Sequence, residues 1–276
     1  MGALLGGLAS LLYGVGDFLG GEGAKRAPAA SIVLWAGVIS FPIVAVVAFL
    51  VGGSATRSDL LLGVAAGACG GVGLVFLFAG LGRGQAAAVA PASAAFSGVF
   101  PVMVALFTGE RPSFLVWVGV ALAVPAIVLS SWVAEPGDVR LGGLWYGVAA
   151  GLGFGGYVVA IGGTSESSEL LPLITARAST MAVVVLISVL GLWRVTGFRR
   201  VPNAIVIGNG LLDVCGNIAL LTALRVGSLA TVGVTASFFP AVTVAMARVI
   251  NKEHLRGRQV VGLILTIAAL GAITVG

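Results

Sequence analysis

The chain contains ten consecutive apolar stretches, and each is long enough to cross a lipid bilayer as an α-helix. A helix needs about 20 apolar residues to span the hydrocarbon core. The stretches lie approximately at residues 2–22, 30–52, 60–80, 87–108, 114–133, 141–162, 171–193, 203–223, 229–250 and 257–275. Because only short connections remain between them, the sequence predicts an all-α polytopic membrane protein with ten transmembrane helices.

The composition supports this class of protein. Hydrophobic residues make up 59% of the 276 residues and charged residues only 9%, whereas soluble domains carry roughly 25% charged residues. The net charge is +5, and most of the basic residues lie in the connections and not in basic runs interleaved with aromatic residues. This charge therefore fits membrane insertion and gives no indication of nucleic-acid binding.

The second half of the sequence repeats the first. Small residues with a period of four form two ladders 141 positions apart, Gly2, Gly6, Ser10 and Gly14, then Gly143, Gly147, Gly151 and Gly155. Because five is an odd number of spans, the second unit enters the membrane in the opposite orientation. We expect two inverted five-helix repeats, residues 1–134 and 141–276, with a substrate site at their interface.

Two acidic residues fall well inside the predicted spans, Asp17 in the first and Asp213 in the eighth. A carboxylate at membrane depth costs about 2.5–3.5 kcal/mol on insertion scales, so it must face protein or a wet cavity. Each could bind a cationic substrate or exchange a proton; the alternative is a protonated acid bonded to a neighbouring helix. Asn217 shares a helix face with Asp213. The two together could bind an ammonium group or a polar amide, or Asn217 could make an ordinary interhelical hydrogen bond.

Aromatic residues accompany these polar groups. Tyr13 lies one turn before Asp17, and Phe154 and Tyr157 are the aromatic counterparts in the sixth span. They could line a pocket and stack on a cation, or they could serve only as packing mass.

Prolines and one arginine also lie within spans. Pro91, Pro101 and Pro240 are candidate hinges for alternating access, or tolerated kinks, and the last two occupy roughly matching places in the two units. Arg177 lies seven residues into the seventh span. Its side chain could extend to the membrane interface, which is our first interpretation, or contact a substrate carboxylate.

Three sequence features resemble the EamA-type permeases of the drug/metabolite transporter superfamily. They are the pairs Tyr13-Gly14 and Phe154-Gly155, the pattern from Pro101-Val102-Met103 to Gly109-Glu110-Arg111-Pro112-Ser113, and a weaker copy from Phe239-Pro240-Ala241 to Lys252-Glu253-His254-Leu255. The resemblance implies a ten-helix carrier for amino acids, other small metabolites, drugs or sugars. It also implies that both chain ends lie on the cytoplasmic side.

The distribution of basic residues implies the reverse orientation. Connections after odd-numbered spans contain most of the lysines and arginines, whereas those after even-numbered spans contain only Arg57, Arg111 and Arg225. Because cytoplasmic connections are rich in basic residues, this bias places both chain ends outside. The two indications conflict.

Together these features predict a secondary transporter of the bacterial inner membrane, a monomer or homodimer with no cofactor. We expect export of an amino acid or related small solute, with proton coupling or facilitated diffusion as the energy source. The alternatives are an integral-membrane enzyme and a membrane assembly subunit that does not transport. The first would need a catalytic cluster, and the one histidine, His254, lies in a charged connection; the second does not account for Asp213 or the duplication.

Overall fold

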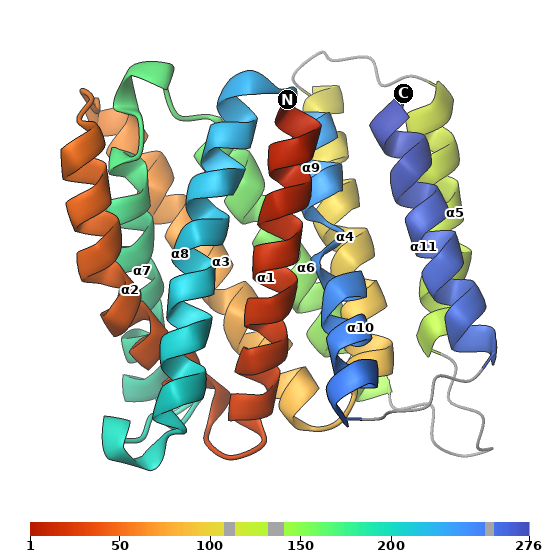
Figure 1. Ribbon diagram of the computed structural model, residues 1–276, viewed down its shortest axis with the longest axis horizontal. Coiled ribbons are helices and arrows are strands. Elements are labelled where there is room, and N and C mark those ends of the chain that lie inside the picture. The colour runs from red at the N-terminus through yellow and green to blue at the C-terminus, as the bar shows by residue number, and fades with distance from the viewer. Residues whose placement is uncertain (108–113, 132–140, 252–256, 276) are drawn as a thin grey trace.

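The computed structural model describes residues 1–107, 114–131, 141–251 and 257–275, and these ranges contain helices and no β-strand. The α-helices are α1 (Gly2–Ala24), α2 (Ala29–Val51), α3 (Arg57–Gly82), α4 (Ala86–Phe107), α5 (Phe114–Ser131), α6 (Leu141–Gly162), α7 (Leu171–Val189), α8 (Asn203–Val226), α9 (Leu229–Ala236), α10 (Phe239–Asn251) and α11 (Gly257–Val275). Short 3-10 helices, η1 (Glu166–Ser168) and η2 (Phe198–Arg200), lie in two connections. The α-helices run side by side along one direction, and both chain ends lie at the same end of the bundle (Figure 1).

The protein is a multi-pass membrane protein. Six of the helices, α1, α2, α3, α6, α7 and α8, are long and apolar enough to cross a membrane by length and composition. Large apolar side chains on the outside of the bundle are exposed, among them Leu4, Phe49 and Val249. Such a surface is suited to lipid, because a soluble protein rarely exposes so much contiguous apolar area.

The first helix of each half packs against helices of the other half. Helix α1 packs against α8, and α6 packs against α3. Helix α6 also packs along α4, as α1 packs along α9 and α10, while α5 and α11 pair with each other at one edge (Figure 1). The interface between the halves therefore runs through the centre of the bundle.

The two glycine ladders allow this close packing between the halves. A Cβ atom on Gly14 of α1 would lie 2.6 Å from the Phe239 carbonyl oxygen, and one on Gly151 of α6 would lie 2.6 Å from the Ser93 carbonyl oxygen. Real Cβ atoms do not approach other atoms so closely. Each ladder thus brings the first helix of one half against the backbone of the other half.

The ninth span differs from the prediction. Residues 229–250 were expected to form one helix, but α9 ends at Ala236 and α10 begins at Phe239. Pro240 has no N–H to donate to the Ala236 carbonyl, and its ring disfavours helix there. The Ser237 hydroxyl instead donates to the Gly233 carbonyl at 2.6 Å.

The other two candidate hinge prolines lie inside an uninterrupted helix. Helix α4 continues through Pro91 and Pro101 without a break, and α2 contains Pro42, which the sequence analysis did not single out. The hinge role of Pro91, Pro101 and Pro240 stays a prediction.

At both ends of the bundle, hydrogen bonds join a connection of the second half to a helix of the first half. At one end the Asp59 carboxylate, which caps α3, accepts a hydrogen bond from the Ser165 N–H at 2.6 Å. At the other end the Thr196 N–H donates to Ser31 Oγ at 2.8 Å, and Trp35 Nε1 donates to the Thr196 carbonyl at 2.8 Å. These bonds fix the halves to each other on the side of α2 and α7.

Some residues of the sequence motifs lie outside the described residues. They are the charged connection from Gly109 to Ser113 and its copy from Lys252 to Leu255, which includes His254.

The glycine ladder predicts a difference between two substitutions on α1. Gly14→Ala should destabilise the protein by about 1–3 kcal/mol, because the new methyl group meets backbone that has no room for it. Gly7→Ala, on the same helix, meets no atom within 4 Å and should stabilise by about 0.5–1 kcal/mol through helix propensity. Apparent melting temperatures in detergent would test this, and equal values for both variants would contradict the close-packing account.

Candidate functional site

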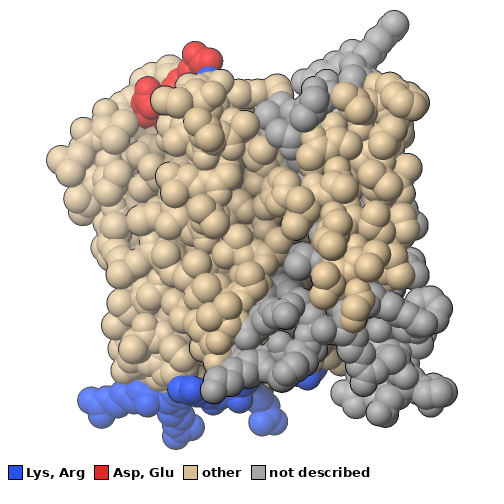
Figure 2. Space-filling model, turned by 45° about the vertical axis from the view of Figure 1, so that its right-hand side comes forward, with Lys and Arg blue, Asp and Glu red and all other residues tan. Residues whose placement is uncertain are grey.

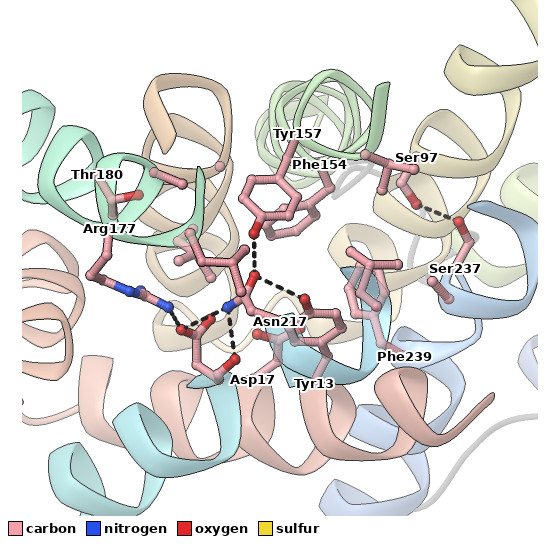
Figure 3. Close-up of a pocket in the computed structure, with 18 of the residues that line it drawn as sticks. Tyr13, Asp17, Ser97, Phe154, Tyr157, Arg177, Thr180, Asn217, Ser237 and Phe239 are labelled. Carbon is pink, nitrogen blue, oxygen red and sulfur yellow. Dashed lines mark hydrogen bonds and ion pairs between the residues drawn. The ribbon is translucent and has the colours of Figure 1, made fainter. Parts of the chain in front are cut away.

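A cavity of about 80 Å³ lies inside the helix bundle. Residues from α1, α2, α3, α4, α6, α7, α8, α9 and α10 line it, so both halves contribute (Figure 3). A water molecule needs roughly 10–15 Å³ on this measure, so the cavity can hold several waters or a small organic solute. Most of its wall is apolar, with a few polar groups on one side, as is common for binding sites of small molecules.

An ion pair between Arg177 of α7 and Asp213 of α8 lies in the cavity wall. The Arg177 side chain is 8% exposed and the Asp213 side chain 17% exposed. The interpretation that Arg177 extends to the membrane interface is therefore wrong. An arginine seven residues into a helix can reach the interface, but here a carboxylate on the neighbouring helix holds it in the interior.

Asn217 connects the ion pair to the aromatic residues. Its Oδ1 accepts hydrogen bonds from the hydroxyls of Tyr13, at 3.0 Å, and Tyr157. Its Nδ2 donates to the Asp213 carbonyl oxygen at 2.7 Å and to Asp213 Oδ2 at 3.1 Å, as their four-residue spacing predicts. Figure 3 shows Tyr13 and Tyr157 converging on Asn217, so one amide joins helices α1, α6 and α8.

Asp17 differs from Asp213 in having no hydrogen-bond or ion-pair partner among the described residues. It is 6% exposed, lines the cavity one helical turn after Tyr13, and makes no hydrogen bond or ion pair within the part of the chain that the structure describes. An unpaired carboxylate is expensive at such a depth. Asp17 is therefore stable as a neutral acid or beside a cation, and its oxygens are available to a ligand or a proton.

The internal repeat relates many positions that line the cavity. The matched pairs are Tyr13 with Phe154 and Asp17 with Val158 at a shift of 141, Gly70 with Asp213 and Leu74 with Asn217 at a shift of 143, and Ser97 with Ser237 at a shift of 140. The last two meet across the interface, Oγ to Oγ, at 3.2 Å. The cavity thus lies between the halves. In four of the five pairs, however, one residue has a polar side-chain group and its counterpart has none.

The six residues predicted to bind substrate or a proton all line this cavity. Sequence reasoning missed several others, including Thr180, the hydroxyl pair Ser97 and Ser237, and Phe239. Phe239 meets Phe154 edge to face with ring centroids 5.4 Å apart. The position of Phe239 directly before Pro240, a candidate hinge, is the sequence signal that could have drawn attention to this side of the cavity.

The described residues contain no group of three or more His, Cys, Asp and Glu side chains that could hold a metal ion.

The ion pair predicts strong non-additivity between its two partners. Arg177→Gln alone or Asp213→Asn alone should cost about 3–5 kcal/mol, because each leaves a buried charge without its partner. The double variant should cost less than the sum of the two, since no charge remains uncompensated. Melting temperatures of the three variants in detergent measure the coupling, and additive effects would show that the pair is not coupled.

Comparisons with known proteins agree with this architecture. Curated protein sequences gave no match. One solved structure, described only as the crystal structure of a protein, has a TM-score of 0.70 and 16% sequence identity, covering 99% of this chain and 97% of that one; this similarity concerns the fold. A sequence model described as the EamA-like transporter family matches residues 1–132 and again 141–275. With both halves matched over nearly their whole length, the chain belongs to the EamA-like transporter family.

Proposed function

We propose that the protein is a secondary transporter that moves a small solute through the central cavity by alternating access. In this proposal ten spans form two inverted repeats, residues 1–134 and 141–276, in a bacterial inner membrane. The observation that carries the proposal is a partly polar cavity lined by repeat-related positions of both halves. A cavity between inverted repeats can open to either side when one half moves against the other.

The charges in the cavity favour an amino acid or a related small solute. Arg177 offers a guanidinium group that can bind a carboxylate, and Asp17 and Asp213 offer carboxyl groups to an amine. Tyr13, Phe154 and Tyr157 add aromatic surface for an apolar side chain or a cation. We propose export as the direction, by similarity to family members that export such solutes.

The two carboxyl groups have different roles in this proposal. Asp213 is already neutralised by Arg177, so a bound solute must compete for that pair. Asp17 has no counter-charge within the described ranges and is the better site for a transported proton or for the ammonium group of the solute. Exchange of a proton for the ammonium group of the solute at Asp17 would couple transport to the proton gradient.

The interrupted ninth span is the proposed moving part. Because α9 ends and α10 begins beside the cavity, the two segments can tilt separately around Ser237 and Pro240. Pro101 and Pro91 give α4, the matching element of the first half, a weak point of the same kind.

Reconstituted protein tests the proposal directly. Liposomes that contain a pH-sensitive dye would receive amino acids, small amines or sugars, and counterflow of labelled solute would be measured in parallel. We expect solute-evoked proton movement with the native protein. Asp17→Asn should abolish the proton movement. Asp213→Asn should reduce counterflow at least tenfold, because it removes a carboxyl group that the proposal assigns to the amine of the solute.

Glu166→Gln provides a matched control, because Glu166 is an exposed carboxylate outside the cavity. This variant should retain both activities. Counterflow without proton movement would identify a uniporter. Full activity in Asp213→Asn would remove this residue from the site, and no counterflow for any solute class would favour the assembly-subunit alternative.

A further inference from the structure

The exposed charges of the described residues are separated between the two ends of the bundle. Six exposed basic residues lie in connections at the end away from the start of α1, namely Lys25, Arg26, Arg83, Arg194, Arg199 and Arg200. We call this set the basic face. Figure 2 shows basic side chains along one end of the molecule and acidic side chains at the opposite end.

Among the residues that the structure describes, little acidic charge offsets the basic face. In this part of the chain Glu22 is the acidic residue beside it, and its carboxylate pairs with Lys25 at 2.6 Å. At the opposite end Glu166 and Glu169 are exposed together with Arg57. Arg225 is half-buried there and donates to Thr164 Oγ1 at 2.9 Å. Among the described residues, then, the opposite end carries no surplus of positive charge.

The segment that carries three of the six basic residues is firmly positioned. Residues 190–202 connect α7 to α8, and Thr196 within them is bonded to Ser31 and Trp35 of α2. The rings of Trp35 and Phe198 pack at 5.3 Å between centroids. Arg194, Arg199 and Arg200 are therefore presented on a fixed platform rather than on a loose loop.

Aromatic residues form a layer directly beneath the basic face. Phe76 packs against Tyr146 and Trp193, with ring centroids 6.0 and 5.9 Å apart. The Arg83 guanidinium lies over the Tyr146 ring at 4.9 Å from its centroid. Aromatic rings topped by cationic groups are the arrangement found where a membrane protein meets lipid headgroups.

We propose that the basic face binds the anionic phospholipid headgroups of the cytoplasmic leaflet and sets the orientation of the protein. This leaflet carries a negative surface potential that attracts basic residues next to a membrane span. Both the start of α1 and the end of α11 then lie on the external side, as does the bond between Asp59 and Ser165. This orientation is opposite to the one that the family resemblance implied, and it holds whether or not the cavity transports a solute.

Cysteine labelling in bacterial spheroplasts tests the orientation. In a Cys69→Ala, Cys215→Ala background, Ser167→Cys reports on the end with Glu166, and Gly197→Cys reports on the basic face. Both positions are exposed, and Gly197 has a φ of −62° and no atom near its Cβ position, so a side chain is tolerated there. A membrane-impermeant maleimide should label Ser167→Cys in intact spheroplasts, and Gly197→Cys only after permeabilisation.

A charge variant tests whether the basic face sets this orientation. In the Ser167→Cys protein, Arg194→Gln, Arg199→Gln and Arg200→Gln together should lower the externally labelled fraction about twofold. Arg57→Gln, which removes one positive charge at the opposite end, should leave that fraction unchanged. Labelling after permeabilisation gives the total inserted protein, so poor expression cannot imitate the effect.

Two results would overturn the proposal. Labelling of Gly197→Cys in intact spheroplasts, alone or equally with Ser167→Cys, would show the opposite or a mixed orientation. An unchanged labelled fraction in the triple variant would show that the basic face does not determine orientation.

Discussion

The neutralisation of Arg177 inside the bundle is the constraint on which the central architecture depends. A guanidinium group remains charged at any physiological pH, so its burial requires a carboxylate in contact and hydrogen bonds around that carboxylate. Asp213 supplies the contact and Asn217 orients Asp213. Since Asn217 also accepts from Tyr13 and Tyr157, one buried charge fixes the relative positions of α1, α6, α7 and α8.

Close backbone packing makes this polar centre possible. The ladders place small residues where α1 and α6 cross the opposite half, as Gly14 and Gly151 illustrate. Larger residues there would separate the halves and move Tyr13 and Tyr157 away from Asn217. The apolar ladders and the polar cluster are two parts of one interface, and each requires the helix spacing that the other sets.

Periodic features were predictable from the sequence, and contacts between distant residues were not. Apolar length predicted a membrane protein, and the glycine ladders together with Asp17 and Asp213 indicated which helix faces lie inside. The partner of Arg177 could not be predicted, because it depends on how α7 packs beside α8. The bond from Asp59 to Ser165 spans 106 positions and leaves no local pattern. Pro240 was noticed as a hinge candidate, but the break between Ala236 and Phe239 was not predicted, since α4 passes through two prolines without one.

Repeat-related positions that line the cavity carry chemically different side chains, and this difference affects the free energies of the forms that a carrier would adopt. Two identical halves would give outward-open and inward-open forms of equal free energy, with equal affinity for a bound solute. In this chain the repeat-related counterpart of Asp17 is Val158. The counterparts of Asp213 and Asn217 are Gly70 and Leu74. In a carrier that alternates between these forms, the two would therefore differ in free energy and in affinity for a solute, while the direction of net movement would still follow the gradients. Divergence of a few lining residues is thus sufficient to give a duplicated scaffold a preferred resting form.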